Sequence, residues 1–592
     1  MNGNELLWPG GTPRGGLDIS LAAEDLELTR LCALLFPGFQ GAEALQFAAP
    51  YLTDDPDTIR LRQETVTDLV RHPELLDAFR RLRGLLDELE ICDRGVRDNA
   101  MGLRVTRMDA AMDGVKKAVM KLEKNLSKQG ADILEESAAD NRYAQLLRLT
   151  HFRRRLTGLY VEAVTLLRDS LAKLRPESPA LKALGAWAAR CCEADKVADT
   201  AAVLRRLDEE WKGVGAFSVD VCLDGRRMVV GLEMAEVRET PFAQPGMLEG
   251  AGSDSVREGI TSLISFPQNG NAVLFQEYLL SEVGYEVRNR LTKLREALVK
   301  LPVTGGTELL TLRDALRFYT GAAEFACRLR DRGSALCAPR LLTGGSTLEF
   351  TAARLPEQTC TGTLPVPNDL YLESGGCILM TGPNSSGKTC CLIMAGQFLF
   401  LGQLGCLLPA EEAAFSPRDR LLTLFAAGES ETGEDSRMGL EVQRLKLLRE
   451  RMTKKSIFLL NEPMTSTSAE EGGQICVDLL ADLTQKGVPS MLVTHFNHIW
   501  PELQAKFAAL GCADRLHSLV MTVEERLGGV EYLYRLKAAP PPPSSHARAV
   551  IAAKGVTLEN MLRVLNEKGV DMRPNADAWP ALRSGAVWEV KV

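Results

Sequence analysis

The feature that most constrains this chain is a glycine-rich segment at residues 382–389. It reads Gly-Pro-Asn-Ser-Ser-Gly-Lys-Thr and matches GxxxxGK[ST] at every fixed position. The apolar run Cys377–Met380 precedes it, and a long apolar stretch follows it. Between a strand and a helix this pattern binds phosphates, because backbone N–H groups of the loop and helix N-terminus point at the anion. We therefore predict a nucleotide-phosphate site formed by Gly382, Pro383, Asn384, Ser385, Ser386, Gly387, Lys388 and Thr389.

Two of these residues have further predicted roles. We expect Lys388 to reach the β- and γ-phosphates and the Thr389 hydroxyl to hold Mg²⁺. A second apolar run, Ile457–Leu460, ends in Asn461-Glu462. An Asp is usual at the first of these positions, where it orients toward the metal. Asn461 keeps an acceptor oxygen but lacks the negative charge, so we expect it to reduce Mg²⁺ affinity and turnover rather than nucleotide binding. Glu462 is the candidate general base that activates the attacking water.

A third apolar run, Val488–Val493, ends in Thr494-His495. Ligands of α/β domains bind at the carboxyl ends of strands. His495 is therefore a candidate contact to a γ-phosphate or to the attacking water, with a purely structural histidine as the alternative.

The remaining chain changes its hydrophobic period twice. Residues from about 20 to 215 have apolar positions three to four apart, which predicts helices. Alternating residues then flank Asp224-Gly225, which predicts a β-hairpin near 216–235. From about Ser346 the pattern becomes strand–loop–helix. We predict a multidomain chain with a mainly α-helical part at 1–345 and an α/β domain at 346–592, including a helical tail from about 544.

The longest uncharged run, Cys390–Ala410, is long enough to raise the question of a membrane span. It contains Gln397, Gln403 and Pro409 and directly follows the glycine-rich loop. We interpret it as a buried helix running into a strand. Glu5 interrupts the N-terminal segment where a signal peptide needs an apolar core. We therefore expect a cytoplasmic protein with no membrane partner.

These motifs resemble those of the MutS family of DNA mismatch-repair ATPases. Residues 381–389 are similar to the family's TGPNxxGKS, and Gly405–Ala410 to its GxxVPA. Asn461-Glu462 with Thr467-Ser468 is similar to DExxxGTS, with Asp replaced by Asn461. Further similar segments are Pro367-Asn368-Asp369, Ile59–Gln63, Thr494-His495 and Tyr534–Lys537.

The resemblance implies a fold and an assembly. Residues 1–345 correspond to a helical core and lever, with a clamp reduced to one hairpin. Residues 346–592 correspond to a P-loop ATPase domain of ABC type that dimerises. Ser436-Arg-Met-Gly-Leu-Glu441 is similar to the signature STFMxE, which implies that Ser436 reaches the partner subunit's nucleotide in a homodimer. The core motif begins by Ile59, so we expect the branch without mismatch-recognition and connector domains.

Charge placement bears on a DNA partner. The chain has 70 Lys+Arg and 78 Asp+Glu, a net charge of −8, which argues against coating nucleic acid by overall charge. Between Arg94 and Arg175, however, 17 basic and 10 acidic residues give +7. A stripe of this kind holds phosphates without reading sequence, although a solvated helix face is an equal alternative. The possible contacts are Lys117, Lys121, Lys124, Arg226 and Arg227.

The combined prediction is an ATP- and Mg²⁺-dependent DNA-repair or recombination ATPase that acts as a nucleotide-switched clamp on duplex or branched DNA. The alternative is a nucleotide-gated interaction protein that binds ATP, scarcely hydrolyses it and recruits a partner protein. Asn461 favours the alternative, whereas Lys388, Thr389, Glu462 and His495 favour the enzyme. An ABC- or SMC-type ATPase is a weaker third interpretation, because long heptad arms are absent from the sequence.

Overall fold

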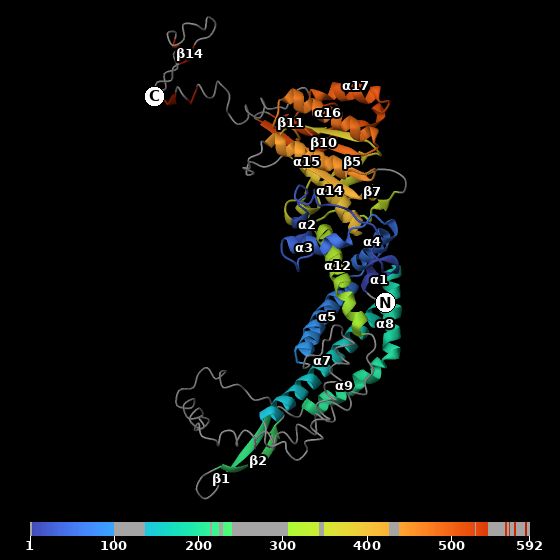
Figure 1. Ribbon diagram of the computed structural model, residues 1–592, viewed down its shortest axis with the longest axis vertical. Helices are drawn as coiled ribbons and strands as arrows, with labels where there is room; N and C mark the ends of the chain where they lie inside the picture. The colour runs from blue at the N-terminus through green and yellow to red at the C-terminus, as the bar shows by residue number, and fades with distance from the viewer. Residues whose placement is uncertain are drawn as a thin grey trace. The chain divides into compact units, whose positions relative to one another are not determined.

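The computed structural model describes residues 3–99, 137–212, 216–223, 229–238, 306–342, 348–425, 437–526 and 529–542, with four dipeptides between 563 and 588. Contacts divide the chain into two compact units, 1–11 with 72–317 and 12–71 with 318–592 (Figure 1). The chain is multidomain, with helical and mixed α/β parts. The division near residue 345 stays a prediction. The tail from 544 lies largely outside the described residues, which there include the paired strands β13 (Pro574–Asn575) and β14 (Val587–Trp588).

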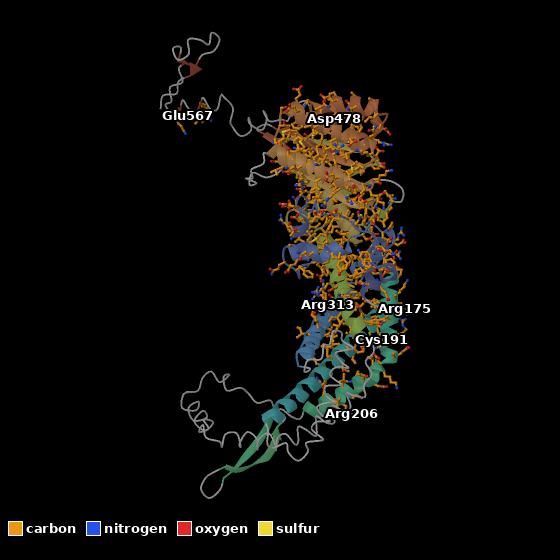
Figure 2. All side chains as sticks on the ribbon, viewed as in Figure 1. Arg175, Cys191, Arg206, Arg313, Asp478 and Glu567 are labelled. Atoms are coloured by element: carbon orange, nitrogen blue, oxygen red, sulfur yellow. The ribbon has the colours of Figure 1, made fainter. Side chains whose placement is uncertain are left out.

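The first unit is mainly helical, as the apolar spacing predicts. Leu82 and Leu86, four residues apart, are fully buried. Arg313 forms an ion pair with Glu90 (Figure 2), and Arg317 with Asp87 at 2.7 Å. The helices are α1 (Gly3–Leu7), η1 (Pro9–Gly11), α5 (Pro73–Asn99), α7 (Ser137–Leu174), α8 (Pro179–Ala194), α9 (Val197–Lys212) and the first part of α12 (Gly306–Asp331).

The predicted hairpin is confirmed in this unit. Strand β1 (Ala216–Leu223) pairs antiparallel with β2 (Val229–Arg238), and Val221 lies opposite Leu232. Arg226 and Arg227 belong to the turn, which lies outside the described residues. Whether this hairpin serves as a clamp stays a prediction.

The second unit begins with a group of helices that surrounds a buried arginine. Arg62 is fully buried, and its guanidinium lies 5.4 Å from the centre of the Phe318 ring. Burial lowers the pKa of Arg62 to about 10. Gln63 donates to the Pro339 carbonyl at 3.1 Å, so the Ile59–Gln63 segment is joined to the chain that follows α12. The helices are α2 (Leu28–Leu35), α3 (Ala42–Ala48), η2 (Ala49–Tyr51), α4 (Pro56–Arg71), the rest of α12 and α13 (Pro356–Thr361).

A buried carboxyl group lies at the start of α13. Glu357 is 4% exposed and contacts the Arg30 guanidinium at 2.9 Å. Burial and the nearby Glu27 raise the pKa of Glu357 to about 7, because the attraction of Arg30 is the smaller effect. The Arg30 side chain is 65% exposed, which explains its weak influence.

Two sheets form the centre of the second unit. One has the strand order β12-β11-β6-β10-β9-β8, parallel except for the antiparallel edge pair β11–β12. The other has the order β3-β7-β4-β5. The strands are β3 (Arg340–Leu341), β4 (Leu348–Ala353), β5 (Asn368–Leu372), β6 (Cys377–Thr381), β7 (Glu412–Phe415), β8 (Arg420–Phe425), β9 (Ser456–Asn461), β10 (Ser490–Val493), β11 (Leu516–Arg526) and β12 (Gly529–Ala538).

The helices of this unit explain the uncharged run of the sequence. Residues 391–404 of α14 (Lys388–Leu404) are all buried, and α14 contacts β9 and β10. Gly405 ends the helix in the left-handed region, and β7 starts only at Glu412. The predicted buried helix is confirmed, but a loop separates it from the strand. Within the described ranges, no helix combines the length and apolarity needed to cross a bilayer. The other helices are α15 (Arg437–Arg451), α16 (Ala469–Gln485), α17 (Ile499–Ala509) and η4 (Ala513–Arg515).

The strand order decides what lies near the glycine-rich loop. Strand β10 pairs in parallel with both β6 and β9, so the carboxyl ends of these three strands are adjacent. Each of them carries one of the polar motifs found in the sequence. Ser468 caps α16 by accepting the Glu471 backbone N–H at 3.2 Å, which fixes the turn from the end of β9 into that helix.

Candidate functional site

The glycine-rich loop connects β6 to α14 in a conformation that requires glycine at two positions. Gly382 and Gly387 have φ values of 141° and 96°. A Cβ on Gly382 would lie 2.9 Å from the Met521 Cβ, too close for any side chain. Ser385 also has a positive φ, 63°. The loop therefore turns tightly enough for successive backbone N–H groups to face one concave surface, as anion binding requires.

Lys388, at the start of α14, is folded back onto this loop. Its ammonium group donates to the carbonyls of Gly382 and Pro383, both at 2.9 Å. Ser386 also donates to the Pro383 carbonyl, at 2.7 Å. Burial lowers the pKa of Lys388, and the charge of Glu462 opposes that shift. A buried ammonium whose hydrogen bonds go to neutral carbonyl oxygens is a strong attractor for phosphate.

Thr389 and Asn461 meet at the ends of α14 and β9. The Thr389 hydroxyl donates to Asn461 Oδ1 at 3.1 Å. Both are oxygen ligands of the type that Mg²⁺ prefers, so the residues present fit this ion. Neither carries a charge, so any metal held here depends more on the phosphates than it would beside an Asp.

Glu462 and His495 form a pair at the ends of β9 and β10. His495 Nε2 lies 2.7 Å from Glu462 Oε1. The hydrogen bond from His495 is the main cause of the lowered pKa of Glu462, and burial opposes it. Glu462 has a positive φ of 50°, and its N–H donates to the Val493 carbonyl at 2.8 Å. This strained backbone is therefore fixed by the neighbouring strand, and it sets the direction of the carboxylate.

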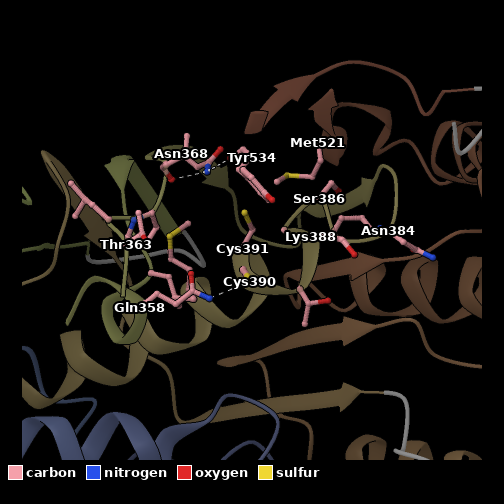
Figure 3. A pocket seen from close by; sticks show the side chains of 18 of the residues that line it. Gln358, Thr363, Asn368, Asn384, Ser386, Lys388, Cys390, Cys391, Met521 and Tyr534 are labelled. Atoms are coloured by element: carbon pink, nitrogen blue, oxygen red, sulfur yellow. Dashed lines mark hydrogen bonds between the residues drawn. The ribbon is translucent and has the colours of Figure 1, made fainter. Parts of the chain in front are cut away.

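Most of these residues line one cavity of about 720 Å³ (Figure 3), whereas Gly382, Pro383 and Asn461 are not part of its lining. Its wall includes the loop from Asn384 to Thr389, Glu462 and His495. The sequence predicted these residues as parts of the site but not several others that line the same cavity, among them Gln358, Asn368, Met521 and Tyr534. The tripeptide at 367–369 and the segment at 534–537 were signals for two of them, but neither indicated a role in the cavity.

Two predicted groups lie outside the described residues. Ser436 immediately precedes α15, so its place relative to the cavity is not described. Further along the same motif, Glu441 is buried and accepts a hydrogen bond from Ser466 at 2.9 Å. This contact joins α15 to the loop that follows Glu462.

The possible DNA contacts Lys117, Lys121 and Lys124 also fall outside the described residues, as do Arg226 and Arg227. Several other basic residues of the +7 stretch are described, among them Arg154 and Arg155. Arg154 forms an ion pair with Asp208, and Arg155 with Glu88. These two arginines are therefore partly neutralised within the first unit.

Comparison with known proteins agrees with the motifs. Residues 378–558 match the family model "MutS domain V". The DNA mismatch repair protein MutS of Thermus aquaticus is 28% identical over 306 residues, which are 52% of this chain and 33% of that protein. The MutS of Synechococcus sp. (strain CC9902) is 29% identical over 272 residues, 44% of this chain and 28% of that protein. The matched part thus spans about a third of the length of these relatives.

The matched residues contain the glycine-rich loop, the strand ends that carry Glu462 and His495, and the antiparallel strands β11 and β12. The second unit is thus a mixed α/β module that carries a MutS domain V. Over about half of its length the chain is thus similar to DNA mismatch repair proteins of the MutS family.

Proposed function

We propose that the protein binds ATP with Mg²⁺ in the 720 Å³ cavity, hydrolyses it slowly and uses the nucleotide state to control its grip on DNA. One observation carries this proposal: the glycine-rich loop, Lys388, Thr389, Glu462 and His495 all line the same cavity. Residues from three separate strand ends meet there, which a chance motif match would not produce.

The chemistry follows from the geometry of these residues. Lys388 exchanges its two loop carbonyls for the β- and γ-phosphates. Thr389 and Asn461 would hold Mg²⁺, and this ion would neutralise part of the phosphate charge. Glu462 accepts a proton from the attacking water, and His495 orients this carboxylate and contacts the γ-phosphate. The exposed side chain of Tyr534, which also lines the cavity, provides a surface on which the base stacks.

Two features favour slow turnover. Asn461 lacks the charge of the usual Asp, which weakens Mg²⁺ binding. In addition, the lowered pKa of Glu462 makes it a weaker base, because proton transfer is most efficient when the pKa of the base lies near the working pH.

ATP hydrolysis is tested by steady-state assays on wild type, Glu462→Ala and Glu470→Ala. Glu470 is an exposed carboxylate at the start of α16 and serves as the matched control. We expect loss of turnover only in Glu462→Ala. Equal background rates in wild type and Glu462→Ala would overturn the ATPase and leave the second candidate, a nucleotide-gated protein that recruits a partner. Asn461 is the observation that favours this candidate. Lys388→Ala should abolish nucleotide binding under either function.

DNA binding and assembly are further parts of the proposal. The +7 stretch between Arg94 and Arg175 supplies a sequence-independent surface, and a homodimer places Ser436 at the partner's nucleotide. The logarithm of the binding constant for duplex, mismatched and branched DNA should fall linearly with the logarithm of the salt concentration. Neutralising Lys117, Lys121 and Lys124 together should make this slope less negative by up to about 2.7, because each lost phosphate contact accounts for about 0.9. An unchanged slope would remove these lysines from the DNA surface.

A further inference from the structure

Tyr534 is held in a conformation that its own residue type disfavours. Its φ is 54°, in the left-handed region, although it is neither glycine nor asparagine. The side chain lies on the cavity wall and is 45% exposed. A Cβ built on Gly387 would lie 3.4 Å from the Tyr534 ring, so the ring borders the glycine-rich loop. An unfavourable backbone of this kind persists only where its surroundings over-determine it.

An irregularity in strand pairing creates this conformation. Met521 of β11 pairs with Leu536 of β12, and Val523 pairs with Tyr532. Between these pairs β11 has the single residue Thr522, whereas β12 has residues 533–535. The extra residues form a bulge, and Tyr534 lies at its centre. Bulges next to binding sites redirect a side chain, but they also remove backbone groups from the ladder.

Asn368 of β5 supplies partners for the backbone of this bulge. Its Oδ1 accepts the Leu536 N–H at 2.7 Å, and its Nδ2 donates to the Tyr534 carbonyl at 2.9 Å (Figure 3). Nδ2 also donates to the Val366 carbonyl at 3.2 Å. Asn368 is 8% exposed. One buried amide therefore connects two backbone groups of β12 to the segment that leads into β5.

The chemistry of these contacts requires an amide. Asp at this position keeps the acceptor for the Leu536 N–H but places an oxygen against two carbonyls. Thr522 makes a second contact to the bulge, donating from its hydroxyl to the Arg535 carbonyl at 3.0 Å. That contact holds the carbonyl of Arg535, whereas Asn368 holds the carbonyl of Tyr534 itself and the Leu536 N–H, on either side of Arg535.

We infer that Asn368 is a positioning residue that fixes the bulge in β12 and thereby aims the Tyr534 ring at the base of the bound nucleotide. This inference rests on the proposed nucleotide site. It assigns recognition of the phosphates to the glycine-rich loop and recognition of the base to a wall that depends on Asn368. The two parts of the ligand can then be separated by experiment.

The test compares the affinities of the full-length protein for ATP and for inorganic tripolyphosphate, both with Mg²⁺. Asn368→Ala and Asn368→Asp should each weaken ATP binding about tenfold, the scale of one lost base-stacking contact, and leave tripolyphosphate binding unchanged. Tyr534→Ala should do the same, and Asn368→Ala combined with Tyr534→Ala should be no weaker than Tyr534→Ala alone. The matched control is Asn497→Ala, which loses another amide-to-backbone bond, 2.9 Å to the Pro542 carbonyl, away from the cavity wall.

The outcomes distinguish this inference from the proposed function. If wild type binds neither ATP nor tripolyphosphate, the nucleotide site itself is wrong. If wild type binds both and the Asn368 variants keep the wild-type ratio of the two affinities, the positioning role is wrong. Should Asn368→Ala fail to fold, Asn368→Asp has nearly the same volume and supplies the ratio instead. A loss of both affinities in Asn368→Asp would mean a general structural role and would also overturn the inference.

Discussion

Replacing Asn461 with Asp is expected to convert a weak Mg²⁺ site into a stronger one. The side chain already lies where it accepts the Thr389 hydroxyl at 3.1 Å, and Asp has the same shape. The substitution therefore adds one negative charge without moving the backbone of β9. It also places that charge beside Glu462, whose pKa should rise because like charges disfavour ionisation. Both changes favour turnover.

The size of the effect follows from the surroundings of Asn461. Two unit charges 4 Å apart interact by about 4 kcal/mol at an effective dielectric constant near 20. Asn461 is only partly buried, so solvent screens much of this energy. A net gain of about 1–2 kcal/mol is reasonable, which lowers the Mg²⁺ concentration for half-maximal activity by about 5- to 30-fold.

The assay is steady-state ATP hydrolysis over a Mg²⁺ series at saturating ATP. Asn497→Asp is the matched control, because it makes the same chemical change just beyond the neighbouring strand β10. Asn461→Asp combined with Glu462→Ala gives the background. An unchanged or higher Mg²⁺ midpoint in Asn461→Asp, with the rate still near background, would refute the metal role of this position.

Three further predictions test the second unit. His495→Gln should raise the pKa of Glu462, because the bond from His495 is the main cause of its lowering; the acidic limb of the pH–rate profile then moves to higher pH, and a fixed limb would contradict the pairing. Glu357 has a folded pKa of about 7, above its ordinary 4.5, so its stabilising contribution is complete below 4.5 and is lost as pH rises through 7. The change in melting temperature caused by Glu357→Gln should therefore be more positive at pH 8 than at pH 5. The same change at both pH values would show that Glu357 does not ionise between them in the folded protein. Phe398→Ala should lower the free energy of unfolding by about 3–5 kcal/mol in urea titrations, because Phe398 is 1% exposed and packs 4.9 Å from the Phe350 ring; a loss below about 1 kcal/mol would contradict this packing.

Several features could be predicted from the sequence because they depend on residues close together in the chain. The glycine-rich loop has φ values of 141° and 96° at two positions, and both of these carry glycine. The hairpin follows from period-two alternation on either side of Asp224-Gly225. The strand ends at Asn461 and Thr494 follow from short apolar runs that stop at polar residues.

Other features were decided only by the tertiary structure. Asn368 and Tyr534 are 166 residues apart, and they meet because an irregular register in β12 brings a backbone carbonyl to a buried amide. Glu462 and His495 are brought together by the parallel pairing of β9 with β10, an order that the apolar runs do not specify. Residues 12–71 likewise pack within the second unit, although residues 72–317 of the first unit separate them from the rest of it in the chain. Local spacing fixes which residues share a loop or strand end, whereas the order and register of strands depend on the free energy of the whole packed core.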